Sequence, residues 1–139
     1  MRVLKLCNDV ITVFNAKHNV TADHDDYYRT VISGVSWFHR IETSVDKAGL
    51  NAAGMVIIRI PTDADFSGKA YVNPRDYAES ADVSNVFTLQ DGDVIVKGAV
   101  MENLRPADLH KQHYEAVTVL GVTDDRHFPN APHWRITGK

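Results

Sequence analysis

Histidine and aspartate are the side chains in this sequence best suited to carry out chemistry. The segment HNVTADHDD places His18, His24, Asp25 and Asp26 within nine residues. Because imidazoles and carboxylates are metal ligands, a small metal-dependent hydrolase or binding module is one hypothesis for this chain. The spacing matches no established ligand pattern, however, and the Asn, Asp and Ala content is equally typical of a solvated hairpin tip.

A second group of such residues lies in the C-terminal segment DDRHFPNAPHWRITGK, which contains His127 and His133. A strand pattern precedes it at 117–122 and β periodicity resumes at WRIT, so the segment is predicted to be a closing hairpin with a proline-stiffened turn. In that hairpin Trp134 and Ile136 share one face and fill the core. We therefore interpret the segment as structural rather than as a His/Asp active site.

The remaining candidates also point away from catalysis. His110 and His113 share a helix face but lack the glutamate of an HExxH site, and the single Cys7 cannot form an internal disulfide and is typical of a small buried residue. The sequence contains no nucleophile elbow, phosphate-binding loop or dinucleotide fingerprint. We predict a protein that is not an enzyme, with no catalytic, cofactor or metal residues.

The composition is that of one globular domain spanning residues 1–139. The chain is 44% apolar and 24% charged, it has no apolar run long enough to span a bilayer, and its N-terminus reaches Asn8 and Asp9 too early for a signal peptide. These features predict synthesis in a cytoplasm. The net charge of −3 is spread along the chain, which argues against a dedicated nucleic-acid binder but is compatible with a protein past which DNA slides.

Short apolar runs rich in Val, Ile, Thr and aromatic residues alternate with turn signals. This pattern is typical of a mostly β, antiparallel barrel or sandwich with long loops. Strands are predicted at residues 10–14, 27–38, 55–60, 70–72, 85–89, 94–100, 116–122 and 134–137. Two short helices are predicted to begin at Pro74 and Pro106. The predicted core residues are Trp37, Ile58, Val94, Val96, Trp134 and Ile136.

Three local patterns make sharper predictions. A bulge or bend at Gly34 interrupts the strand YYRTVISGVSWFHR. Its two faces are predicted to carry Tyr27, Val31, Val35 and Trp37 on one side, and Tyr28, Ile32 and Phe38 on the other. The Asp91-Gly92 turn is predicted to join 87–89 and 94–96 as a hairpin. Residues 41–56, rich in Ser, Asp, Gly and Asn, are predicted to form a long functional loop.

The order of these segments resembles a family of uncharacterised phage and prophage proteins of Gram-positive bacteria, encoded among capsid and head-tail morphogenesis genes. The resemblance rests on DVITVFN, YYRTVISGVSW, GLNAAGMVIIRIP, YVNPRDYAE, FTLQDGDVIVKGAV, AVTVLGVTDD and HWRITGK, in that order. The segments LQDGDVIVKG and HWRITGK make it most specific. The loops TADHDDYY and DDRHFPNAP vary freely in such families, which argues against a required site in either.

The resemblance implies a virion structural protein, synthesised in the bacterial host cytoplasm and located at the head-tail junction. Size and β-rich plan are similar to those of head-closure (stopper) proteins, which form a ring, commonly of six, between the portal or its adaptor and the tail. A tail terminator, portal adaptor or minor capsid protein is the alternative. Double-stranded DNA would pass through without specific binding, and no membrane is involved. Candidate contacts to neighbouring copies or partners are Asp46, Leu50, Asn51, Arg126, His127, Phe128 and Pro129.

Overall fold

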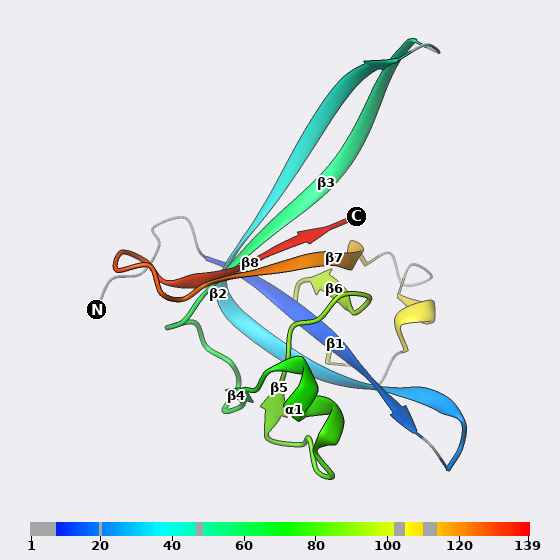
Figure 1. Ribbon diagram of the computed structural model, residues 1–139, viewed down its shortest axis with the longest axis vertical. Coiled ribbons are helices and arrows are strands. Elements are labelled where there is room, and N and C mark those ends of the chain that lie inside the picture. The colour runs from blue at the N-terminus through cyan, green and yellow to red at the C-terminus, as the bar shows by residue number, and fades with distance from the viewer. Residues whose placement is uncertain (1–7, 20, 47–48, 102–104, 110–113) are drawn as a thin grey trace.

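The fold is a closed antiparallel barrel of six strands, in the order β1-β2-β3-β8-β7-β6 (Figure 1). The computed structural model describes residues 8–139 except 20, 47–48, 102–104 and 110–113. The barrel strands are β1 (Asp9–Asn19), β2 (His24–Asp46), β3 (Gly49–Pro61), β6 (Val94–Lys97), β7 (Ala116–Asp125) and β8 (His133–Gly138). The prediction of a mostly β, antiparallel domain is confirmed.

The smaller elements lie in the connections between barrel strands. β4 (Ala70–Tyr71) and β5 (Val86–Phe87) pair in parallel, and with α1 (Pro74–Glu79) they lie beside the lower end of the barrel in Figure 1. The predicted first helix is confirmed, since Asn73 Oδ1 accepts a hydrogen bond from the Asp76 amide at 2.9 Å and Pro74 opens the helix. At the second, the described residues form a 3₁₀ turn, η1 (Pro106–Asp108). No helix among the described residues is long and apolar enough to cross a membrane.

Apolar side chains gather in two clusters, one inside the barrel and one outside it. The predicted core residues Trp37, Ile58, Trp134 and Ile136 belong to the inner cluster. Val96 is buried in the outer cluster, with Phe14, Val100 and Leu109, and Val94 is half-buried against it. Ile95, between them, enters the barrel. Side chains of β6 therefore pack in both clusters, because neighbouring residues of a strand point to opposite faces.

The bulge predicted at Gly34 is present and changes the two faces of β2. Asp9 pairs with Val35 but Val10 pairs with Ser33, so Gly34 is the extra residue, with a φ of +87° that suits glycine. Ile32 consequently joins Val35 and Trp37 in the inner core, although the uninterrupted alternation had placed it on the opposite face. Tyr27, Tyr28 and Phe38 are all exposed.

The predicted hairpin around Asp91-Gly92 is wrong in its strand pairing. Gly92 has the positive φ of a tight turn, +86°, but β6 pairs with β1 and β7, whereas Phe87 belongs to β5. The buried Asn15 explains this, because its Nδ2 donates to the Thr88 carbonyl at 2.7 Å and its Oδ1 accepts from the Thr88 amide at 3.2 Å. A side chain of β1 thus takes the two backbone groups that a hairpin would use.

The same network holds a buried carboxylate. Asp93 is 1% exposed and accepts hydrogen bonds from Asn15 Nδ2 at 2.7 Å, the Ala16 amide at 3.1 Å and Gln90 Nε2 at 3.1 Å. Burial raises the pKa of Asp93, and the hydrogen bonds oppose that rise. The network attaches the connection between β5 and β6 to β1, at the end of the barrel where α1 lies.

The loop predicted at residues 41–56 is instead a β-hairpin. β2 continues to Asp46 and β3 begins at Gly49, with pairs in unbroken register from Ser36↔Arg59 to Asp46↔Gly49. The Gly, Asn and Ser content of this stretch lowers its intrinsic strand propensity. The hairpin register, fixed by the strongly apolar continuations of both strands, overrides that local preference.

Candidate assembly surface

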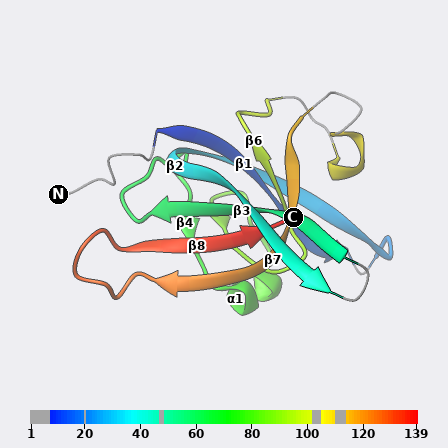
Figure 2. The ribbon, with the colours of Figure 1, turned by 90° about the horizontal axis from the view of Figure 1, so that it is seen from above.

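The β2–β3 hairpin extends well beyond the barrel. β1 accompanies β2 no further than Val35, and β8 accompanies β3 only between Val56 and Pro61. Residues 40–46 and 49–55, here called the arm, therefore have one strand neighbour each among the described residues. Figure 1 shows the arm projecting from the body, and Figure 2 views the molecule from the side on which it leaves.

The arm offers backbone hydrogen-bonding groups along both of its outer edges. A strand with a single neighbour presents unpaired N–H and C=O groups that can pair with another chain. An isolated two-stranded hairpin is also only marginally stable in water, because it lacks a third strand or a packed face. The geometry therefore suits a segment that is completed by contact with a second protein surface.

The predicted contact residues lie at two separate places. Asp46 pairs with Gly49, and Leu50 and Asn51 pair with Val45 and Ser44, at the end of the arm; their side chains lie outside the described part of the structure. Arg126, His127, Phe128 and Pro129 lie in the β7–β8 turn, beside the opposite end of β3, where Pro61 pairs with His133. The structure thus does not bring the two groups together. It places them about 40 Å apart along one strand, at ~3.3 Å per residue.

Two exposed apolar side chains near the base of the arm were missed by the sequence reasoning. Phe38 is 54% exposed and Leu120 is 52% exposed. Phe38 pairs with Ile57, Ile57 with Thr137, and Thr137 with Gly121, so this row crosses four strands and reaches the bulge that contains Leu120. The signal that could have found Leu120 is Gly121, since a glycine inside a strand often marks a bulge.

One polar contact also joins strands near the base of the arm. His39 on β2 contacts the Glu115 carboxylate, which directly precedes β7. Both side chains are about half exposed, so the pair orients the base of the arm more than it stabilises the fold. Apolar and charged groups thus lie close together where the arm leaves the barrel.

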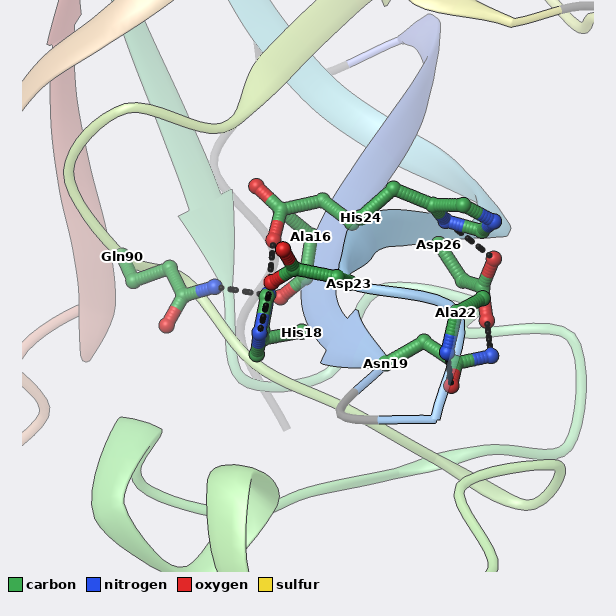
Figure 3. Close-up of polar contacts among 9 residues, drawn as sticks. Ala16, His18, Asn19, Ala22, Asp23, His24, Asp26 and Gln90 are labelled. Atoms are coloured by element: carbon green, nitrogen blue, oxygen red, sulfur yellow. Dashed lines mark hydrogen bonds and ion pairs between the residues drawn. The ribbon is translucent and has the colours of Figure 1, made fainter.

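The histidine and aspartate cluster of the sequence forms the tip of the β1–β2 hairpin. His18 Nδ1 lies 3.2 Å from Asp25 and its Nε2 lies 3.7 Å from Asp23, whereas His24 Nδ1 lies 3.4 Å from Asp26. Figure 3 shows the two imidazoles engaged with different carboxylates rather than facing a common centre. Among the described residues no three His, Cys, Asp or Glu side chains are grouped as metal ligands.

The C-terminal histidines make local contacts within the β7–β8 hairpin, and both rings lie near that of Phe128. His133 Nδ1 donates to the Ala131 carbonyl at 2.8 Å, and its Nε2 lies 3.6 Å from Asp125. The His127 ring packs edge-on against Phe128, with centroids 4.8 Å apart. The predicted closing hairpin is confirmed, with Trp134 and Ile136 buried. Cys7, His110 and His113 lie outside the described residues.

Comparison with known proteins gives a family and no function. A model described as "Family of unknown function (DUF6751)" matches residues 6–139, which is nearly the whole chain. No curated protein matches the sequence and no solved structure matches the fold.

Proposed function

Because the chain belongs to the family of unknown function DUF6751, which brings no activity with it, we propose a function from its own residues and shape. The proposed function is that of a structural protein of a tailed-phage virion, specifically the head-closure (stopper) protein of the head-tail connector. Copies of the chain assemble into a ring, six being the expected number, between the portal or its adaptor and the tail. The protein is synthesised in the bacterial cytoplasm and has no catalytic step.

The observation that carries the proposal is the arm. Its two outer strand edges have no neighbour among the described residues, and the exposed Phe38 and Leu120 lie beside its base. An arm at one end of β3 and the β7–β8 turn at the other give the subunit two different surfaces. Two unlike surfaces on one subunit form head-to-tail contacts, and such contacts generate a ring when the rotation between copies closes.

The charge distribution also supports a conduit for DNA. The chain has a net charge of −3, with 15 basic and 18 acidic residues. A ring that gripped phosphates with clustered lysine and arginine would bind passing DNA in a strongly salt-dependent way. A near-neutral to acidic subunit lets DNA move through. The tail terminator, portal adaptor and minor capsid protein are the alternatives within the same setting.

The test is to shorten the arm without opening the barrel. Ile41 pairs with Gly54, so replacing residues 42–53 by Asn-Gly joins two opposite residues through a two-residue hairpin turn. We expect this variant to fold cooperatively and to remain monomeric by native mass spectrometry, under conditions in which the wild-type protein forms rings, alone or with the portal complex.

The matched control shortens the other hairpin in the same way. Lys17 pairs with Asp26, so Asn-Gly in place of residues 18–25 removes the histidine and aspartate tip. Ring formation should survive this change. Rings that persist without the arm, or a wild-type protein that never joins virions, would refute the proposal.

A further inference from the structure

Arg126 is held at an aromatic and acidic site formed by segments far apart in the sequence. Its guanidinium lies 5.0 Å from the Tyr71 ring centroid and 5.1 Å from that of Trp134. Its Nε and Nη2 donate to the two carboxylate oxygens of Asp124, at 2.9 Å and 2.6 Å. Two parallel hydrogen bonds together with ring contacts are the combination that distinguishes arginine from lysine.

The electrostatics of this group agree with its geometry. The hydrogen bond from Arg126 lowers the pKa of Asp124 to about 2, and the same bond raises the pKa of Arg126. The pair is therefore charged at every pH at which the protein would work. Both side chains are partly exposed, 44% for Arg126 and 49% for Asp124, so the pair can open without disrupting the core.

A pocket of about 410 Å³ adjoins this group, within the usual range for side-chain or small-ligand sites. Its lining includes Tyr71, Leu89, Asp91, Val122, Asp124 and Trp134. Asp91 is exposed, in the turn that precedes β6, and adds a second carboxylate. The pocket therefore combines an apolar and aromatic lining with two acidic groups, of which Arg126 neutralises one.

We propose that this pocket, here called the arginine pocket, receives an arginine side chain from a partner protein. The incoming guanidinium replaces Arg126 on Asp124, Tyr71 and Trp134, which line the pocket and which Arg126 contacts from its edge. Asp124 and the two rings would hold the incoming guanidinium as they hold Arg126. Asp91 favours a cation over a neutral or acidic group. The displaced Arg126 is then able to pair with an acidic side chain of the partner, so the exchange conserves ion pairs.

Arginine is favoured over lysine by the shape of the site. A planar guanidinium presents two N–H groups to one carboxylate while stacking on a ring, whereas an ammonium group is a compact, strongly hydrated point charge. Since Arg126 is tethered two residues from Asp124, it competes at a high effective concentration. The wild-type protein should therefore bind a free arginine analogue much more weakly than a protein without Arg126.

The experiment titrates N-acetyl-arginine methylamide into Arg126→Ala and follows the indole N–H signal of Trp134 by NMR, assigned with a Trp37→Phe variant. We expect saturable binding at least tenfold tighter than in the wild-type protein, and at least fivefold tighter than binding of the lysine analogue. Adding Asp124→Asn to Arg126→Ala should abolish it. Arg126→Gln serves as a second background if Arg126→Ala fails to fold.

Three results would each overturn the inference. They are equal binding by Arg126→Ala and wild type, equal binding of the arginine and lysine analogues, and binding that survives Asp124→Asn. The inference goes beyond the proposed ring and does not rest on it, because the readout uses the monomer and a small probe. Its failure would leave the ring experiment unaffected.

Discussion

The two halves of β3 differ in strand pairing, because the half in the barrel has two strand neighbours and the half in the arm has one among the described residues. Between Val56 and Pro61 the strand is paired on both sides, and Val56, Ile58 and Ile60 are at most 3% exposed. Between residues 49 and 55 the same strand has one neighbour among the described residues, and its sequence there is GLNAAGM. The barrel half is thus stabilised by burial between two neighbouring strands, whereas the arm half has one strand neighbour among the described residues.

Removing β8 is the largest change that tests this difference. Deleting residues 130–139 removes Trp134 and Ile136 from the core and leaves the barrel half of β3 with the single neighbour that the arm half has. We expect the protein to lose cooperative unfolding altogether, as measured by urea denaturation with far-UV circular dichroism. A soluble truncation that still unfolds in one sharp transition would show that burial by β8 is dispensable.

A pair of point substitutions in β3 compares its halves directly. Ile58→Ala should lower the free energy of unfolding by about 2 to 5 kcal/mol, because it leaves a cavity at a position that is 0% exposed. Asn51→Ala in the arm, where the strand has one neighbour among the described residues, should change it by less than ~0.5 kcal/mol. Chemical denaturation of the two monomeric variants measures both values. Similar losses would mean that the arm is as well packed as the barrel.

The buried carboxylate of Asp93 in the barrel should make the free energy of unfolding depend on pH. Burial raises the folded-state pKa of Asp93 above 3.8, so its contribution to stability is complete below that pH and is lost as the pH rises through the raised value. The Asp93→Asn variant has no titrating group at this position. Its side-chain amide would face the Asn15 amide, and the lost hydrogen bonding should lower the free energy of unfolding by about 1 to 3 kcal/mol.

The stability advantage of the wild-type protein over Asp93→Asn should therefore narrow as the pH rises from about 3 to about 7. Urea denaturation at several pH values measures this gap. Asp91→Asn, at an exposed position two residues away, is the matched control for the loss of one carboxylate. A gap that widens with pH would contradict the raised pKa.

A small effect on stability is also expected at the tip of the β1–β2 hairpin. His24→Ala removes one exposed ion pair, with Asp26, and should change stability by less than ~1 kcal/mol. Metal analysis of the purified wild-type protein should find no stoichiometric zinc or manganese. Bound metal that is lost in His24→Ala would restore the hydrolase hypothesis for His18, His24, Asp25 and Asp26.

The elements predicted correctly from the sequence are those whose conformation is determined by residues close to one another in the chain. The Asn73-Pro74 helix start, the Gly34 bulge and the closing hairpin with Trp134 each follow from a few neighbouring residues. The failure of residues 87–89 to pair with β6 could not be read in the same way, because Asn15, more than seventy positions away, bonds the backbone of Thr88. The arginine pocket was hidden for the same reason, since Tyr71, Asp91 and Asp124 come from separate elements.

The arm was missed for a different reason. Gly49, Asn51 and Gly54 are turn formers by composition, and a strand with no core face lacks the apolar alternation by which strands are recognised. The segment therefore looks like a loop in the sequence, although its backbone pairs as a hairpin. The sequence therefore singled out Asp46, Leu50 and Asn51 as candidate contact residues, but it did not show that they lie in paired strands.

Closure of the barrel by β8 also sets the order in which the chain can fold. β3 pairs with residues 133–138, so it gains its second neighbour only after those residues have been synthesised. Until then the whole length of β3 has an open edge, and long-range pairings of this kind form slowly. During synthesis the nascent chain therefore exposes a longer unpaired strand than the folded protein does, and neighbouring nascent chains can pair along it before the barrel closes.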